Sequence, residues 1–206
     1  MPQQTSIAQC PVSWGVASRA LPGQSVCGDL HLIRTFADGA LIAVVDGLGH
    51  GEEAAVAAKT ALAVLENHPE APLNVLVQSC HEALKKTRGA VMTLAFLQCP
   101  ERQLTWLGVG NVEALLVSAN RPTRRAVVLS GVVGYQLPAL RASAVPMTAG
   151  DLLMFVTDGL DAGFPEELGS KETPQALADR ILERHFKGND DALVLAVRCL
   201  GTAHES

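Results

Sequence analysis

The sequence lacks any excess of basic charge and any long apolar run. Its 16 Lys and Arg residues against 21 Asp and Glu residues give a net charge of −5 at pH 7. A protein that binds nucleic acid or an anionic membrane needs a concentrated positive field, so this balance argues against both kinds of partner. No apolar stretch reaches the roughly 18 residues of a membrane span, and residues 1–5 do not resemble a signal peptide. We therefore expect a cytoplasmic protein.

Cysteine is absent from the spacings that give it a chemical function. None of the five cysteines stands in a metal-finger or C-x-x-C pattern, and such patterns mark zinc and redox sites. We therefore expect reduced, mostly buried thiols, as is typical of cytoplasmic proteins. The five residues are Cys10, Cys27, Cys80, Cys99 and Cys199.

Apolar residues are abundant and make up 48% of the 206 residues. This length and composition predict one domain over residues 1–206 with a large core. Strands are predicted where apolar residues alternate or run together between turn residues, and helices where they recur every three or four positions. The expected strands are 12–20, 30–36, 40–45, 91–98, 103–109, 113–118, 126–129, 141–146, 152–156 and 192–199, and the expected helices are 52–67, 73–86 and 174–186.

The order of these elements predicts the architecture. Two successive helices between strands do not fit an alternating βαβ chain. The middle strands are closely spaced, with turn residues at 100–101, 110–111 and 120–122, which is typical of antiparallel pairing. We therefore expect two antiparallel sheets packed face to face, with the helices outside.

Aspartates collect at the ends of the predicted strands. Asp46 and Asp158 end the two most apolar strands, Asp29 stands where a turn meets a strand, and Asp190 precedes the last strand. Carboxylates beside buried strands are costly without a counter-charge, and the sequence places no matching set of Lys or Arg near them. Hard oxygen ligands without Cys or His favour Mg²⁺ or Mn²⁺ over Zn²⁺. The alternative is that each aspartate only caps a turn or helix.

The most specific segment is the glycine-rich stretch D-G-L-G-H-G at residues 46–51. Its three glycines allow the backbone to approach a ligand closely. The stretch is not a phosphate-binding P-loop, because Gly-Lys-Ser/Thr is absent, and not a dinucleotide-binding fingerprint, because the G-x-G-x-x-G spacing is absent. It resembles the D-G-x-G-H-G signature of the PPM-type metal-dependent Ser/Thr phosphatases, in their bacterial SpoIIE-like branch.

Further motifs carry this resemblance along nearly the whole chain in the family's order. They are C-G-D at 27–29, G-A-V-M-T-L at 89–94, V-T-D-G at 156–159 and G-N-D-D-A at 188–192. The stretch G-V-G-N-V-E at 108–113 is most similar to RsbX-type members, which act on stressosome proteins in bacterial stress signalling. The resemblance implies an α+β fold, the αββα four-layer sandwich of two mainly antiparallel sheets flanked by helices.

The resemblance also implies a site for two Mn²⁺ or Mg²⁺ ions and a role for each motif residue. Asp46 would be the catalytic ligand that bridges the two ions, and Gly47 would contribute its backbone carbonyl. Asp158 and Asp190 would hold one ion. Asp29 would help to hold the other, through water.

Other positions are supporting candidates or depart from the family pattern. Many relatives hold the phosphate with an arginine where this chain has a serine, so Arg19 is the nearest upstream candidate. Asn111 stands where some relatives have an aspartate that binds a third ion, so no strong third site is expected. Asp191 follows the predicted ligand, and the motif leaves open which of the two aspartates binds directly. His50 is expected to orient the glycine loop or contact solvent rather than act as an acid.

The implied reaction is hydrolysis of phosphoserine or phosphothreonine in a protein by a hydroxide bridging the two ions. The expected substrates are phosphorylated stressosome scaffold proteins. A phosphorylated anti-anti-sigma factor is the alternative substrate, which the sequence does not separate from them. A phosphatase-like binding module without activity is the alternative from another class. The oligomeric state does not follow from the sequence.

Overall fold

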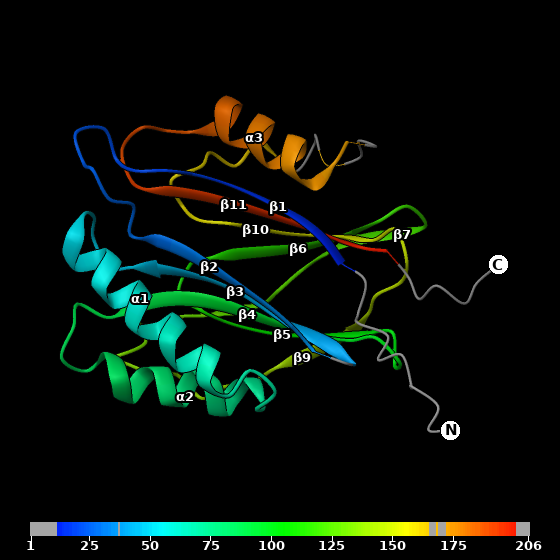
Figure 1. The fold of residues 1–206 in the computed structure, drawn as a ribbon, viewed down its shortest axis with the longest axis horizontal. Helices are drawn as coiled ribbons and strands as arrows, with labels where there is room; N and C mark the ends of the chain where they lie inside the picture. Colours follow the sequence, from blue (N-terminus) through cyan, green and yellow to red (C-terminus); the bar gives the residue numbers. More distant parts are fainter. Residues whose placement is uncertain (1–11, 37, 165–167, 169–171, 201–206) are drawn as a thin grey trace, which may run out of the picture.

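The computed structural model describes residues 12–36, 38–164, 168 and 172–200. These residues form four layers, which are helix α3, a five-stranded sheet, a six-stranded sheet and the helix pair α1 and α2 (Figure 1). α3 spans Pro174–His185, α1 spans Glu52–Asn67 and α2 spans Leu73–Leu84. The predicted sandwich of two mainly antiparallel sheets with helices outside is therefore confirmed.

The five-stranded sheet brings the first and last strands side by side. Its order is β1-β11-β10-β6-β7, and all its pairs are antiparallel. β1 and β11 are in register over eight residues, from Val12 opposite Cys199 to Arg19 opposite Ala192. The strands are β1 (Val12–Arg19), β6 (Glu113–Ser118), β7 (Arg121–Arg125), β10 (Leu152–Val156) and β11 (Ala192–Cys199).

The six-stranded sheet is built on a hairpin of β2 and β3, which pair along their whole length. Its order is β2-β3-β4-β5-β8, and β9 pairs with β5. The chain passes from this sheet to the other between β5 and β6, so the middle strands are divided between the two sheets. The strands are β2 (Asp29–Phe36), β3 (Gly39–Gly47), β4 (Ala90–Gln98), β5 (Gln103–Val109), β8 (Val128–Leu129) and β9 (Ser143–Pro146).

Strand β3 is apolar from Ala40 to Val45 because both of its faces are covered. Ile42 and Val44 pack in the core between the two sheets, whereas Leu41 and Val45 pack in the core under α1 and α2. Successive side chains of a strand point to opposite faces. Asp46, two residues after Val44, therefore points into the space between the sheets.

Two strands differ from the sequence prediction. Of the turn expected at 120–122, only Asn120 lies in a turn, and Arg121 instead starts strand β7, whose register against β6 shifts between Leu116 and Ser118. Pro122 fits there because an irregular edge strand does not need its missing N–H. The strand expected at 126–129 is shortened to β8, which pairs with β5 in parallel and not antiparallel.

The cysteines also differ in part from the prediction. Cys99 is disulfide-bonded, so the expectation of reduced thiols is wrong for this residue. Spacing patterns reveal only local cysteine motifs, whereas a disulfide joins any two cysteines that the fold brings together. Cys27 and Cys80 are free thiols.

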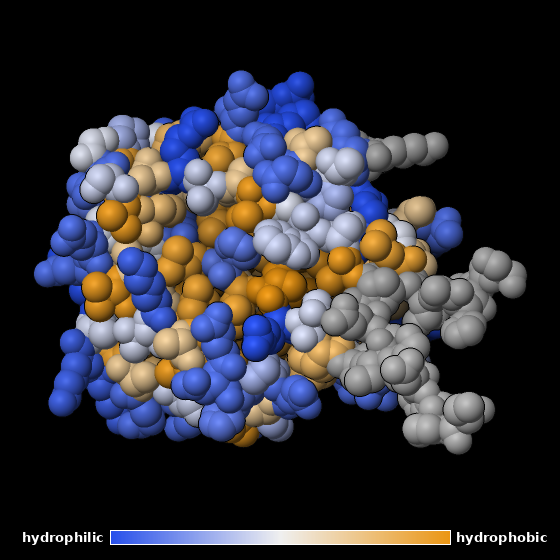
Figure 2. Space-filling model, in the orientation of Figure 1, coloured by the Kyte–Doolittle hydropathy of each residue, from blue (hydrophilic) through white to orange (hydrophobic). Residues whose placement is uncertain are grey.

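The surface follows the layered arrangement. Figure 2 shows hydrophilic side chains over the helical layers and apolar side chains along the middle of the face, where the edge strands β1 and β2 lie. None of the helices within the described ranges is long and apolar enough to cross a membrane.

Candidate metal centre

Asp29 and Asp46 lie side by side at one end of the six-stranded sheet. Asp29 begins β2, Asp46 stands near the end of β3, and the two are paired in the β2–β3 ladder. Beyond the effect of burial, the carboxyl group of Asp29 is near enough to raise the pKa of Asp46. Asp29 is buried, with 3% of its surface exposed, and Asp46 is half-buried. The hairpin register thus brings two predicted ligands into contact.

Thr157 connects this pair to the opposite sheet. Its hydroxyl donates to Oδ2 of Asp29 over 2.7 Å and accepts the backbone N–H of Leu193 over 2.8 Å. Thr157 directly follows β10, and Leu193 lies in β11 of the five-stranded sheet. Because Thr157 is only 2% exposed, both bonds are shielded from water. The threonine of the V-T-D-G motif therefore fixes the orientation of Asp29.

Asp191 holds the loop that precedes β2. Its two carboxylate oxygens accept the backbone N–H of Leu21 over 2.7 Å and that of Gly28 over 2.6 Å. Asp190 accepts the N–H of Asp191 through one oxygen, Oδ1, over 2.8 Å. Since backbone donors occupy both oxygens of Asp191, Asp190 is the better placed of the two to offer an oxygen to an ion.

Asp158 and Asn111 meet at the exposed rim of the same end. The side-chain amide of Asn111 donates to Oδ2 of Asp158 over 2.7 Å. Asn111 lies just beyond β5 and Asp158 just beyond β10, so this contact joins the two sheets a second time. Asn111 thereby limits the orientations available to Asp158.

The aspartates raise one another's pKa. Burial is the largest cause for Asp46, whose pKa rises to about 9, and repulsion from Asp29, Asp158 and Asp190 adds to it. Burial likewise raises the pKa of Asp29 to about 7, against the lowering effect of the Thr157 hydroxyl. The pKa of Asp158 is also raised, first by burial and then by Asp190. Ionisation of these carboxyl groups is therefore unfavourable without a counter-charge.

Divalent cations fit this set of oxygen donors. In the described part of the chain, no Lys or Arg forms an ion pair with Asp29 or Asp46. A cation would favour the ionised carboxylates that burial and repulsion now disfavour. Among the described residues, no group of three Asp, Glu, His or Cys side chains is arranged to hold one metal ion. Mg²⁺ usually keeps several waters and takes one or two carboxylates from the protein.

Gly47 lets helix α1 lie directly against the strand that carries Asp46. A Cβ at this position would stand 2.0 Å from the backbone oxygen of Ala54, so a side chain would displace the helix. The N–H of Gly47 donates to the carbonyl of Gly28 over 3.2 Å, and the N–H of Leu48 donates to that of Gly89 over 3.0 Å. These bonds fix the beginning of the glycine loop beside the aspartates.

Arg19 and His50 take no part in this cluster of contacts among the described residues. The guanidinium of Arg19 lies 5.1 Å from the ring centroid of Phe186. Ala17, on the same face of β1, packs in the core under α3, so Arg19 faces the α3 layer and not the space between the sheets. His50 is exposed in the glycine loop.

The sequence analysis missed the role of Thr157, and it named Asp191 without finding which groups it holds. A periodic signal for Asp191 was available, because it has the same parity as Leu193, which packs between the sheets, and so must point inward. The same signal was available for Thr157, which has the parity of Phe155 in that core, but its partner Asp29 is 128 residues away and has no local signal.

Most of the chain matches a known protein family. Residues 37–200 match the family described as Stage II sporulation protein E (SpoIIE). The phosphoserine phosphatase RsbX of Bacillus subtilis (strain 168) is 27% identical over 139 residues, which are 68% of this chain and 70% of that protein.

Solved structures share the fold over almost the whole chain. A chain of the structure described as "The bacterial stressosome: a modular system that has been adapted to control secondary messenger signaling" is 30% identical, with a TM-score of 0.85 over 91% of this chain and 100% of that one. RsbX in complex with magnesium is 23% identical, with a TM-score of 0.82 over 91% of this chain and 94% of that one. The catalytic domain of PstP with two manganese ions is 16% identical, with a TM-score of 0.72 over 92% and 98%.

Proposed function

The chain belongs to the SpoIIE family, and from this premise we propose that it removes phosphate from phosphoserine or phosphothreonine of a bacterial signalling protein with two divalent cations. The predicted family and the predicted enzyme class, a protein-serine/threonine phosphatase, are confirmed by the family match and by the relation to RsbX. The predicted class of cofactor agrees with the magnesium of RsbX and the manganese of PstP. We treat residues 1–206 as one phosphatase domain.

The pair of buried Asp29 and half-buried Asp46, tied to the opposite sheet through Thr157, is the observation that carries this proposal. Two contacting carboxyl groups with raised pKa values gain most from a cation, because the ionised forms are those that burial disfavours. Aspartates that only cap turns would not need to face one another across a ladder.

The ligand roles that we propose are those of the family motifs. Asp46 would bridge the two ions, with the carbonyl of Gly47 beside it. Asp158 and Asp190 would hold one ion, and Asp29 would help to hold the other. When bound, the ions supply the Lewis acidity that activates water and offsets the charge of the phosphoryl group.

The surrounding residues position these ligands. Thr157 holds Asp29 by donating a hydrogen bond to it, and Asn111 does the same for Asp158. Asp191 keeps the loop before β2 closed against the site. Because each donor is itself fixed in or next to a strand, the ligands need little rearrangement when ions bind.

Phosphorylated stressosome scaffold proteins are the substrates that we propose, and we expect the enzyme to meet them in the cytoplasm. The relation to RsbX and the fold shared with a chain of a stressosome structure support this choice. A phosphorylated anti-anti-sigma factor is the alternative substrate. Neither nucleic acid nor a membrane is an expected partner of a chain with a net charge of −5.

Release of phosphate from a phosphorylated scaffold protein tests the proposal. We expect release with Mn²⁺ or Mg²⁺, and none with EDTA. Asp46→Asn should lower the rate by more than about a hundredfold, since even the loss of an outer partner of a ligand costs about 10–100-fold. The variant should fold, because asparagine has the shape of the protonated carboxyl that the metal-free site favours. Asp38→Asn, an exposed change at the β2–β3 turn, is the charge-matched control.

The outcomes separate the reaction from the substrate. Metal-dependent turnover of p-nitrophenyl phosphate without release from the scaffold would keep the phosphatase and reject the substrate. Inactivity toward both, with Mn²⁺ bound, would reject the reaction in favour of a binding module.

A further inference from the structure

Arg88 lies against the glycine loop, outside the aspartate cluster. The β3–β4 ladder pairs Gly47 with Ala90, and the Leu48–Gly89 hydrogen bond continues it by one residue. The next position brings Arg88 next to Gly49. A Cβ on Gly49 would stand 2.6 Å from Nη1 of Arg88, so this glycine leaves room for the guanidinium.

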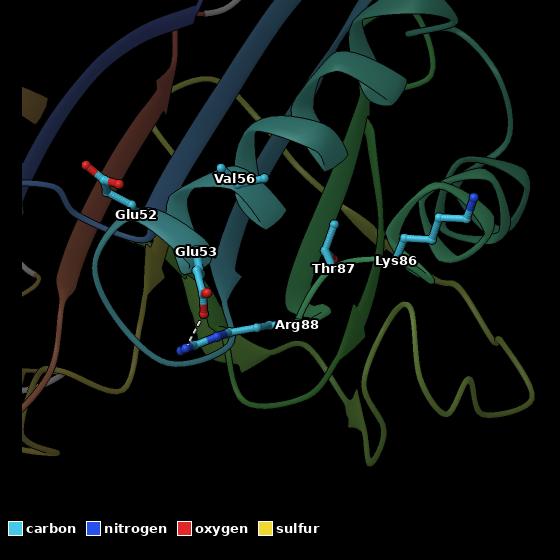
Figure 3. A pocket seen from close by; sticks show the side chains of 6 residues that line it. All are labelled: Glu52, Glu53, Val56, Lys86, Thr87 and Arg88. Carbon is cyan, nitrogen blue, oxygen red and sulfur yellow. Dashed lines mark ion pairs between the residues drawn. The ribbon is translucent and has the colours of Figure 1, made fainter.

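An ion pair with Glu53 keeps Arg88 in this place. Glu53 lies in the first turn of α1, and its carboxylate points toward the guanidinium (Figure 3). The two side chains line one wall of a pocket of about 410 Å³ between α1 and the segment before β4, together with Val56 and Thr87. Because Arg88 lines the pocket and lies beside Gly49, the pocket adjoins the glycine loop that begins at Asp46.

The Arg88–Glu53 pair is poorly explained as a stabilising contact. The side chains are 49% and 69% exposed, and ion pairs this exposed contribute at most about 1 kcal/mol. Glu53 can therefore be exchanged for another anion at little cost. A guanidinium offers a planar fork of N–H donors that fits phosphate and carboxylate oxygens equally well.

We propose that Arg88 receives an oxyanion of the substrate beside the glycine loop, in exchange for Glu53. The inference rests on the proposed phosphatase function and names a recognition residue for it. Arg19, the arginine predicted for this task, faces the α3 layer instead. The oxyanion is either the phosphoryl group itself or a carboxylate next to it in the phosphorylated segment, and both use the same chemistry.

Steady-state kinetics of the full chain with Mn²⁺ test this role. The substrates are p-nitrophenyl phosphate, a phosphoserine peptide with acidic neighbours and the same peptide with neutral neighbours. Arg88→Ala should raise KM about tenfold or more, the factor given by one charge-assisted hydrogen bond. Arg88→Lys should raise KM less than Arg88→Ala does, and Glu53→Gln should lower KM. The inhibition constant of inorganic phosphate gives a second readout that does not depend on turnover.

Lys85→Ala is the matched control. Lys85 is 51% exposed and forms an ion pair of 2.6 Å with Glu82, which is 59% exposed. The Lys85→Ala variant therefore also loses one positive charge and one exposed ion pair, at a position three residues from Arg88. We expect it to leave all KM values unchanged.

The pattern of effects identifies the oxyanion. Weaker binding of all three substrates and of inorganic phosphate with Arg88→Ala would assign Arg88 to the phosphoryl group. Weaker binding of the acidic peptide alone would assign it to a neighbouring carboxylate. Unchanged KM values in an active, folded Arg88→Ala protein, or equal changes in Lys85→Ala, would overturn the inference. An inactive wild-type protein would instead reject the proposed function.

Discussion

Replacing Thr157 by valine removes one hydroxyl and nearly nothing else, because the two side chains have almost the same shape. The hydroxyl donates to the buried carboxylate of Asp29 and accepts the N–H of Leu193. The change therefore breaks the link between Asp29 and the five-stranded sheet, and it also removes the acceptor of the Leu193 N–H within that sheet. It tests whether Asp29 must be held from outside in order to bind an ion.

The structure gives a magnitude for both effects. A hydrogen bond to a charged group contributes about 1.5–3 kcal/mol, and a buried N–H left without an acceptor costs about 1–3 kcal/mol. We expect Thr157→Val to lower the free energy of unfolding by about 3 kcal/mol. Loss of an outer partner of a ligand weakens metal binding about 10–100-fold. The pKa of Asp29 should rise further, since the Thr157 hydroxyl lowers it.

Urea denaturation in EDTA and calorimetric titration with Mn²⁺ measure the two effects separately. Thr93→Val is the matched control, because the buried hydroxyl of Thr93 donates to the carbonyl of Val112 over 2.6 Å and contacts no carboxylate. It should lower stability without changing the affinity for Mn²⁺. Equal Mn²⁺ affinity of Thr157→Val and the wild type would refute the reasoning that Thr157 orients a metal ligand.

Two further predictions concern the site as a whole. Stability of the metal-free protein should fall as the pH rises from about 4 to 9, because the raised pKa values of Asp29 and Asp46 favour the protonated folded form and that advantage is lost as the carboxyls ionise. Urea midpoints at pH 5, 7 and 9 in EDTA measure this, and a stability that rises over the range would contradict it. Mn²⁺ should raise the melting temperature, because an ion that binds only the folded protein adds RT ln(1 + [Mn²⁺]/Kd) to the free energy of unfolding. A melting temperature that is flat up to saturating Mn²⁺ would argue against the metal centre, and EDTA should reverse the shift.

The local elements could be predicted because their signals are local. The apolar run of β3 and the helical spacing of α1 depend on neighbours within one turn or one strand, and α1 begins and ends at the predicted residues, Glu52–Asn67. Strand β7 was missed because a proline in a short charged segment is typical of a turn, and only its position at the sheet edge allows it.

The candidate site was predictable as a set of residues but not as a geometry. The positions of Asp29 and Asp46 at strand ends indicated a carboxylate site. Their contact depends on the register of β2 and β3, which the hydrophobic pattern and the turn geometry set together. The different roles of Asp190 and Asp191 depend on which of them faces the loop before β2, and that loop is more than 160 residues away. The same holds for Arg88, whose place beside Gly49 follows from the β3–β4 ladder.

The hydrogen bonds from the Leu21 and Gly28 N–H groups to Asp191 join residues that are 170 and 163 positions apart in the sequence. This separation matters while the chain is being synthesised. A ribosome adds about 5–20 residues per second, so the loop before β2 waits roughly 8 to 34 seconds for its partner to be made. Throughout that time the chain also lacks Asp190 and strand β11, which lies between β1 and β10. If Asp190 and Asp191 have the roles proposed above, we expect a chain that still lacks β11 to be inactive.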